Sequence, residues 1–507
     1  MALVSITTWV LSNWKDRHPD YSIDIHIEAP DVTSNIKVGF AKMPITPDVI
    51  DTWNDVNNDA KYKVEDGDTY NDNNNNGKFD PYWIAGFSNS KPANGVHDDV
   101  WSRTIILDDG NSRIALVSLD AIGFMHDDVI DVRESIPVEL NIDYTIITST
   151  HTHESIDLMG IWGENEFNSG VNPEAMVYLK QQVLISIKNA VANIRPAKLI
   201  FAEDLSGRDS ILIKDTRRPI VKATGIHVMQ VLDAETDTTI GVLVKWANHP
   251  ESLWSRNLQI SSDFPHYVRE SIENGIYSDN KLIKSGLGGV AVYINGAIGG
   301  LMAPHASLPI PDVAKDTTYV KPSFEKAKAV GEQVGLMVLE ALANPDTTIE
   351  KAPISLRAKT LLLPLDNMMF RLASGIGLLN RGFPELFKTR TEIAALNLGP
   401  ATFVAIPGEI YPELIFGGIV NPEGRDFKID PIEVPNIRSM MPGKYKFIIG
   451  LANDEIGYII PKSEWDVDKP YLYNSKRDFY GEENSLGPET APILHREILT
   501  ILNDLQE

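Results

Sequence analysis

The segment Tyr144-Thr145-Ile146-Ile147-Thr148-Ser149-Thr150-His151-Thr152-His153 joins a strand-like run to two histidines. Side chains two residues apart on a strand point to the same face, so both imidazoles are expected to lie together just past a rigid element. Neutral imidazole is the commonest protein ligand for zinc. A single His-x-His pair is also typical of hydrogen-bonded loop histidines, so its meaning depends on the residues that follow the other strands.

Three further strand-like runs are followed by polar residues of the kind that bind metals. In chain order these segments are Asn248-His249-Pro250 after residues 239–247, Pro407-Gly408-Glu409 after residues 401–406, and Asn453-Asp454-Glu455-Ile456-Gly457-Tyr458 after residues 445–451. In α/β sheets, ligands gather beyond the carboxyl ends of the strands. Four strand ends that carry His, Glu and Tyr therefore predict one metal site.

Predicted strands and helices alternate along the chain. Strands are expected at residues 38–47, 102–107, 113–118, 144–149, 226–232, 239–247, 289–294, 358–363, 401–406 and 445–451. Apolar residues at a helical period predict helices at 127–136, 173–194, 267–274, 323–342 and 491–505. This order predicts an α/β fold, with a mixed β-sheet core and flanking helices. Residues 1–35 are expected to form an N-terminal extension, and residues 36–507 one large domain.

The composition excludes several classes of protein. The chain has 507 residues and a formal net charge of −24, from 70 acidic and 46 basic residues. Nucleic-acid backbones bind clustered Lys and Arg, so this charge argues against a nucleic-acid partner. The sequence contains no cysteine. Any metal site must therefore use His, Asp, Glu or Tyr, and there is no disulfide framework.

The sequence also limits the relation to membranes. No run approaches the roughly 18 apolar residues of a transmembrane helix, so no spanning segment is expected. Residues 1–11 are mildly apolar but lack the basic start and small-residue cleavage site of a signal peptide. We expect a secreted or periplasmic protein whose signal has already been removed. The oligomeric state stays open.

The ordered motifs resemble those of the neutral ceramidase family, which are zinc-dependent amidases that cleave N-acyl sphingosines. The resemblance runs from about residue 38 to the end and matches the family's catalytic domain as short motifs rather than continuous identity. The segments that carry it are Gly39…Ile45-Thr46-Pro47, Gly95-Val96-His97…Arg103, Thr150-His151-Thr152-His153, Ala247-Asn248-His249, Pro407-Gly408-Glu409, Gly457-Tyr458 and Tyr480…Leu486-Gly487-Pro488.

This resemblance implies a set of site residues. The implied zinc ligands are His151, His249, Glu409 and Tyr458. His153 would face the substrate and transfer protons. Arg208 falls where the family has an arginine that positions the substrate, and Tyr480 is the analogue of a substrate-contacting tyrosine. The implied activity is hydrolysis of the amide bond of an N-acyl, lipid-like substrate by metal-activated water, with a membrane surface as one source of such a substrate.

The chain departs from the family pattern at three places. Glu154-Ser155-Ile156 replaces the family's Ser-Gly-Pro, Ala303 stands at the position of the family's serine, and residues 51–84 form an insert. A mechanism in which water is the nucleophile does not need that serine hydroxyl. Two alternatives stay open: an ester or lactone hydrolase with the same metal centre, and a binding protein that keeps the metal without turnover.

Two further residues have competing interpretations. Asp263 either orients a ligand histidine as a hydrogen-bonded carboxylate or caps the helix that begins near Pro265. His97 either borders the site or binds a second metal, or it is a buried structural histidine, and we expect the last.

The polar insert contains a calcium-loop pattern. Asp72-x-Asn74-x-Asn76-Gly77-x-x-Asp80 reproduces positions one, three, five, six and nine of an EF-hand loop, although Trp83 occupies position twelve. Asp55-x-Asn57-x-Asp59 begins a poorer copy upstream. The predicted ligands are therefore Asp72, Asn74, Asn76 and Asp80, and bound Ca²⁺ would order the insert rather than take part in chemistry.

Overall fold

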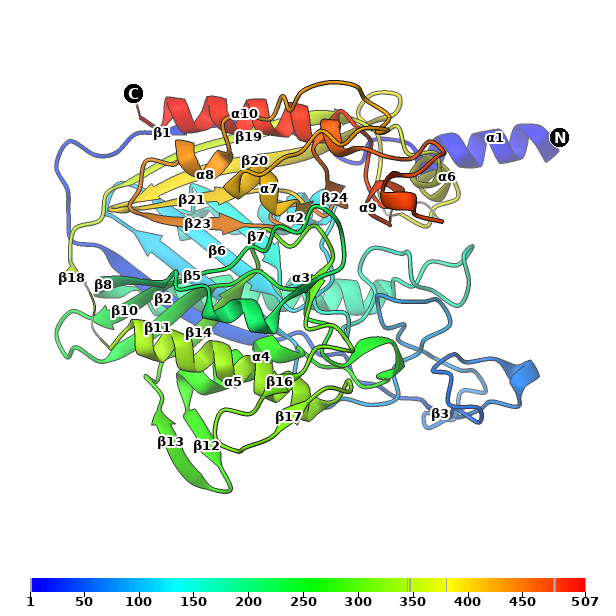
Figure 1. Cartoon of the computed structure of the whole chain (residues 1–507), viewed down its shortest axis with the longest axis horizontal. Helices are drawn as coiled ribbons and strands as arrows, with labels where there is room; N and C mark the ends of the chain where they lie inside the picture. Colours follow the sequence, from blue (N-terminus) through cyan, green and yellow to red (C-terminus); the bar gives the residue numbers. More distant parts are fainter. Residues whose placement is uncertain (1, 344, 346–347, 380, 477–479, 507) are drawn as a thin grey trace.

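A computed structural model, shown in Figure 1, describes residues 2–343, 345, 348–379, 381–476 and 480–506. Its core consists of two β-sheets. The larger sheet has the order β14 (Val290–Ile294), β11 (Thr239–Lys245), β10 (Ile226–Asp233), β8 (Arg195–Asp204), β2 (Lys37–Pro44), β5 (Trp101–Asp108), β6 (Arg113–Leu119) and β7 (Tyr144–Ser149), with β18 (Thr348–Ile349) paired to β8. The smaller sheet has the order β1 (Asp24–Ile27), β19 (Ile354–Pro364), β20 (Lys388–Leu398), β21 (Ala401–Ala405) and β23 (Tyr445–Ile449).

The predicted mixed α/β class is confirmed. In the larger sheet, β6 and β7 are parallel, as are β11 and β14, while the other neighbouring strands are antiparallel. In the smaller sheet only β21 and β23 are parallel. The parallel pairs matter for the site, because their carboxyl ends lie at the same edge.

The two sheets pack face to face. Phe201 of β8 stacks on Tyr445 of β23 with ring centroids 5.2 Å apart, and Phe403 stacks on Phe447 within the smaller sheet at 4.5 Å. Leu243, Leu396 and their neighbours complete this shared apolar layer. Burial of such aromatic and branched side chains between two sheets is the main stabilising contribution to the fold.

Helices cover the outer faces of both sheets (Figure 1). The larger sheet is covered by α3 (Pro173–Ala192), α4 (Phe264–Glu273) and α5 (Phe324–Ala341), and the smaller sheet by α10 (Thr490–Asp504). The start of α3 follows from its sequence, because the Asn172 side chain accepts hydrogen bonds from the backbone N–H groups of Glu174 and Ala175. Each strand and helix expected from the sequence is present, within a few residues at its ends.

Shorter elements complete the chain. The helices are α1 (Ala2–Asn13), α2 (His126–Glu134), α6 (Met368–Gly375), α7 (Pro412–Phe416), α8 (Ile437–Met440) and α9 (Tyr480–Glu483). The strand pairs are β3 (Thr52–Asn54) with β4 (Thr69–Asn71), β9 (Lys214–Asp215) with β15 (Met302–Ala303), β12 (Gly275–Ser278) with β13 (Lys281–Ser285), β16 (Ile310–Pro311) with β17 (Thr318–Tyr319), and β22 (Glu409–Ile410) with β24 (Tyr458–Ile459).

The segment predicted as an N-terminal extension is part of the body of the protein. Strand β1 is an edge strand of the smaller sheet, paired with β19 from Asp24↔Lys359 to Ile27↔Leu356. After α1, the Trp14 indole N–H donates to the carbonyl oxygen of Arg371 in α6 at 3.3 Å. None of the helices in the described ranges is long and apolar enough to cross a membrane.

Candidate metal centre

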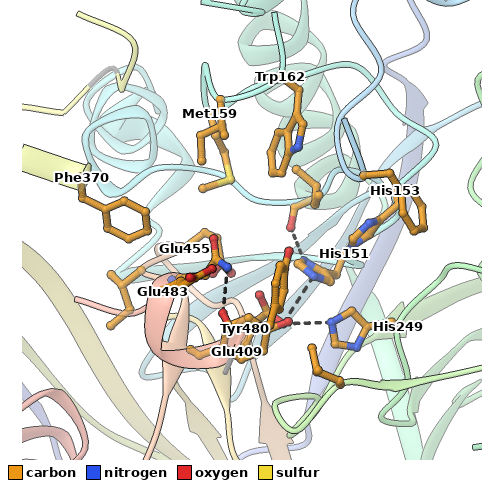
Figure 2. A pocket seen from close by; sticks show the side chains of 18 of the residues that line it. His151, His153, Met159, Trp162, His249, Phe370, Glu409, Glu455, Tyr480 and Glu483 are labelled. Carbon is orange, nitrogen blue, oxygen red and sulfur yellow. Dashed lines mark hydrogen bonds and ion pairs between the residues drawn. The ribbon is translucent and has the colours of Figure 1, made fainter. Parts of the chain in front are cut away.

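Four strand ends meet at one edge of the two sheets, as the sequence predicted. His151 follows β7, His249 follows β11, and Glu409 and Tyr458 follow β21 and β23 in the short strands β22 and β24. Strands β22 and β24 are parallel, and Glu409 and Tyr458 are direct neighbours in their register. All four side chains are buried. The fold thus brings side chains that are far apart in the sequence into one compact group of donor atoms (Figure 2).

The backbone at His151 directs its side chain. His151 has a φ of 67°, in the left-handed region that non-glycine residues rarely adopt. Its backbone N–H donates to the carbonyl oxygen of Ala121, and its Nδ1 lies 2.5 Å from the carbonyl oxygen of Ile122. These bonds hold the ring so that Nε2 faces Glu409, whose Oε2 is 3.7 Å away.

His249 is oriented in the same way. Its Nδ1 lies 2.8 Å from the carbonyl oxygen of Met302, and its Nε2 lies 2.9 Å from Oε2 of Glu409. Glu409 thereby stands between the two imidazoles, and the hydroxyl of Tyr458 hydrogen-bonds to it.

The donor set fits a metal ion. A carbonyl oxygen can only accept a hydrogen bond, so each Nδ1 carries the proton and each Nε2 presents a lone pair. When both rings are neutral, two lone pairs and a carboxylate face one another in a buried space, an arrangement that a cation among them stabilises. Donor separations of 2.9 and 3.7 Å are close to the roughly 3.3 Å between ligands of a tetrahedral zinc ion with 2.0–2.1 Å bonds.

His153 lies beside this group. One ring nitrogen from each of His151, His153 and His249 forms a cluster whose atoms all lie within 4.8 Å of one another. Neither ring nitrogen of His153 has a hydrogen-bond partner among the residues that the structure describes, although Nδ1 lies 3.3 Å from Oε1 of Glu251. Two ligand sets are therefore compatible with the geometry: two histidines with Glu409 and Tyr458, or three histidines.

Burial sets the protonation of these groups. It lowers the pKa of His151 to about 4 and that of His153 well below its usual value, so both rings are neutral near pH 7. Burial also acts to lower the pKa of His249, but the hydrogen bond and charge of Glu409 outweigh it and raise that pKa. His151 therefore already has the neutral form that a metal ligand requires, whereas His249 shares a proton with Glu409 that metal binding would release.

The group lines a cavity of about 900 Å³. Its wall is largely apolar, with Phe87, Met159, Ile161, Trp162, Phe370 and Leu379 among the residues that form it. Figure 2 shows His151, His153 and His249 at the right of this space, Met159 and Trp162 above it, and Phe370 at the left near Glu455 and Glu483. A space of this size, apolar with a few convergent polar groups, is typical of a site for a small organic ligand.

No protein-family model matches the sequence, and no curated protein matches it. Solved structures do match it in fold. A crystal structure of the neutral ceramidase from Pseudomonas aeruginosa superposes with a TM-score of 0.65 and 14% identity, over 93% of this chain and 75% of that one. A structure of a ceramidase complexed with C2 gives the same values. The chain has the neutral ceramidase fold. The resemblance expected from the sequence motifs is thus confirmed at the level of the fold.

In this ceramidase fold, one predicted substrate-binding residue lies elsewhere. Arg208 is on the surface, where it pairs with Asp204 and Glu340 at 2.6 Å each, and it does not line the 900 Å³ cavity. The expectation that Arg208 positions the substrate is therefore not supported by its place. Its short 3-10 helix, Arg208–Leu212, follows β8 and leads the side chain towards α5 instead.

Other predicted residues are placed as follows. Tyr480 lines the cavity, and its ring centroid lies 5.9 Å from that of Tyr458. Asp263 caps α4 by accepting a hydrogen bond from the Phe264 N–H, and no hydrogen bond joins it to the three cavity histidines. His97 is exposed and stacks on Phe324, so the expectation of a buried histidine was wrong.

The family's serine and Ser-Gly-Pro positions also have clear places in the ceramidase fold. Ala303 lines the cavity from β15 and offers no hydroxyl group there. Glu154 is fully buried, 3.8 Å from Nζ of Lys91, and is absent from the cavity wall. Burial raises the pKa of Glu154 to about 8 although Lys91 acts to lower it. Glu154, in the segment that replaces Ser-Gly-Pro, therefore alters the layer behind His153 rather than the surface that a ligand would contact.

Two acids of the cavity were missed in the sequence. Glu251 follows His249 by two residues and contacts His153, as described above. Glu455 lines the cavity with one carboxylate oxygen lacking any partner among the described residues, and burial raises its pKa well above the usual value. The sequence signal for both was their place in the polar segments that follow β11 and β23.

The predicted calcium ligands are brought together in the insert of residues 51–84, which lies between β2 and β5. The carboxylate of Asp72 accepts hydrogen bonds from the N–H groups of Asn76 and Gly77, and the amides of Asn74 and Asn76 donate to Asp80. The upstream copy has the same bonds, from the N–H groups of Asp59 and Ala60 to Asp55. Each loop therefore turns around its first aspartate.

Proposed function

We propose that this protein is a zinc-dependent hydrolase that cleaves the amide bond of an N-acyl, lipid-like substrate. The observation that carries the proposal is the convergence of His151, His249 and Glu409 on one wall of a large, mostly apolar cavity. The apolar wall suits an acyl chain, and the polar group suits the carbonyl at its end. The matching structures are of ceramidases, which supports an amide substrate.

Each residue of the site has its own role in the proposed reaction. His151, His249, Glu409 and Tyr458 would hold zinc, whose Lewis acidity polarises a carbonyl group and acidifies water. His153 is neutral and free to accept the proton lost by the attacking water, and Glu251 beside it stabilises the imidazolium that forms. The same proton then passes from His153 to the leaving amine nitrogen. The phenol of Tyr480 is a hydrogen-bond donor on the cavity wall for the developing oxyanion.

The test combines metal analysis with a hydrolysis screen. We expect hydrolysis of an N-acyl amide to be abolished by a chelator, restored by added Zn²⁺, and lost in His151→Ala. His26→Ala is the matched control, because His26 is an exposed histidine on β1, far from the cavity in the sheet order. Turnover that survives both complete metal removal and His151→Ala would rule the proposal out.

Two alternatives use the same centre. An ester or lactone hydrolase would turn over the ester analogue of the same acyl chain and leave the amide intact. A binding protein without activity is favoured by Ala303, which supplies no hydroxyl to the cavity. Full zinc occupancy with no turnover of amides or esters would support the binding protein.

The insert is proposed to hold calcium. The carboxylates of Asp72 and Asp80 and the amides of Asn74 and Asn76 form the candidate site. Its role would be to order residues 51–84 through oxygen ligands that Ca²⁺ prefers.

A further inference from the structure

A second, smaller cavity adjoins the one that holds the candidate metal centre, and we call it the acidic side cavity. Its volume is about 240 Å³, and Glu464, Asp466, Tyr473 and Glu482 form its wall. The residues that line both cavities are Thr216, Leu301 and Tyr480. The ring of Tyr458 lies 5.9 Å from that of Tyr480 and 6.0 Å from that of Tyr411, which also lines the side cavity. One layer of tyrosines thus connects the side cavity to Glu409.

The side cavity is rich in acids. Its buried cation, Arg217, is paired with Glu413 and Glu464 at 2.6 and 3.3 Å, and its exposed cation, Arg218, lies over the Tyr473 ring, 5.7 Å from the ring centroid. Asp466 and Glu482 are both more than nine-tenths buried, and no basic side chain of the described residues lies within ion-pair distance of either. Two acids without a basic partner therefore remain for a ligand. Burial raises the pKa of both, that of Glu482 to about 8, so a cation bound beside them would favour their charged forms.

Asp466 shows this most clearly. It is 1% exposed, and its Oδ2 accepts a hydrogen bond from the backbone N–H of Leu472 at 2.8 Å. Its Oδ1 has no hydrogen-bond partner in the described part of the chain. A buried carboxylate oxygen without a partner is unfavourable unless a donor or a cation reaches it.

The neighbouring side chains suit an organic cation rather than a metal ion. Tyrosine faces attract alkylammonium groups, and Arg217 already uses one in this way, with its guanidinium carbon 4.2 Å from the centre of the Tyr411 ring. Two groups of three acidic or histidine side chains in the described residues are close enough to hold a metal ion. They are His151, His153 and His249, and His18, Asp131 and Glu134. Neither includes a residue of the side cavity.

We propose that the acidic side cavity binds an alkylammonium group carried by the amine portion of the substrate. This inference rests on the proposed amidase function and specifies its substrate class: an N-acyl amide whose amine half ends in a cation. The acyl chain would occupy the apolar part of the large cavity, the amide would lie at the histidines, and the amine half would pass Tyr480 to reach Asp466 and Glu482. A neutral amine half in the same place would leave both carboxylates without a counter-charge.

The substrate test uses two amides of equal length, N-lauroyl-1,4-diaminobutane and its neutral analogue N-lauroyl-4-aminobutanol. With the zinc-loaded enzyme we expect kcat/KM for the cationic amide to exceed that for the neutral one by about tenfold or more, as charge-assisted hydrogen bonds to a buried carboxylate imply. The ratio is expected to fall towards one in the double variant Asp466→Asn, Glu482→Gln. Asp468→Asn is the matched control, because Asp468 is exposed, lies two residues further on and is absent from the cavity wall.

A binding test separates this inference from the amidase proposal. Calorimetry with 1,4-diaminobutane, and with 1,4-butanediol as its neutral counterpart, needs no turnover. If the diamine binds, its binding is lost in the double variant, and neither amide is hydrolysed, the amidase proposal is refuted. The ligand of the side cavity would then be a free amine rather than part of an amide substrate. Equal hydrolysis of both amides with no diamine binding would overturn the side-cavity inference and leave the amidase intact. Calcium binding that displaces the diamine would overturn it as well.

Discussion

Gly86→Ala should disable His153 without touching the metal ligands. Gly86 has a φ of +85°, and a Cβ placed on it would lie 2.5 Å from Nδ1 and 2.9 Å from Cγ of His153. Ordinary contacts begin near 3.4 Å, so the imidazole must move by about 1 Å. That shift breaks its 3.3 Å contact with Glu251. A displacement of about 1 Å in a catalytic group lowers turnover on the order of a hundredfold.

The stability cost of Gly86→Ala can be separated from this effect. A side chain in the left-handed region costs about 1–2 kcal/mol. Gly207→Ala is the matched control, because Gly207 has a φ of +76° and no atom within 4 Å of the added Cβ. Both variants should lose similar stability in urea unfolding, while only Gly86→Ala should lose activity.

The assay is kcat/KM on an N-acyl amide together with zinc content by elemental analysis. We expect Gly86→Ala to keep one zinc per chain and to lose most of its activity. Wild-type turnover in Gly86→Ala would refute the role of His153 in catalysis. Loss of zinc together with activity would instead make His153 a ligand.

Three other predictions follow from particular side chains. Glu251→Gln should lower kcat/KM about tenfold with zinc content unchanged, because a neutral amide stabilises imidazolium less than a carboxylate does, and unchanged kinetics would contradict the role of Glu251. Asp72→Ala or calcium withdrawal should lower the melting temperature by a few degrees, and a melting curve insensitive to both would show that the insert binds no calcium. Burial lowers the pKa of Lys245 to about 8, below its value in the unfolded chain, so the unfolded chain binds more protons between about pH 8 and 10.5 and stability should rise with pH there. Lys245→Met should remove that rise in urea unfolding measured across this pH window, and a rise that persists in Lys245→Met would assign it to another group.

The regular elements could be predicted because their apolar patterns are local. The stripe of Met176, Leu179, Val183 and Ile187 identified α3, and the apolar run at 144–149 identified β7. Strand β20 was missed because its charged residues are buried. Arg390 pairs with Asp16, and Glu392 with Arg133, more than 250 residues away in each case. A pattern that depends on such distant partners cannot be recognised along the sequence.

The site residues were likewise predictable where they depend on local sequence and not where they depend on distant contacts. His151, His249, Glu409 and Tyr458 could be found because each follows a recognisable strand, and the sheet order brings those strand ends together. Arg208 was misplaced because its motif gives no information on which way the chain leaves β8. Glu251 was missed because its contact with His153 depends on how the chain turns after Pro250, where the Pro250 carbonyl accepts from the His153 N–H.

The zinc content of three purified proteins tests the central claim most directly: the wild type, His249→Ala and His153→Ala. The ligand set of His151, His249, Glu409 and Tyr458 predicts one zinc per chain in the wild type and in His153→Ala, and none in His249→Ala. A wild-type protein that binds no zinc, or a His153→Ala variant that loses it, would contradict that assignment.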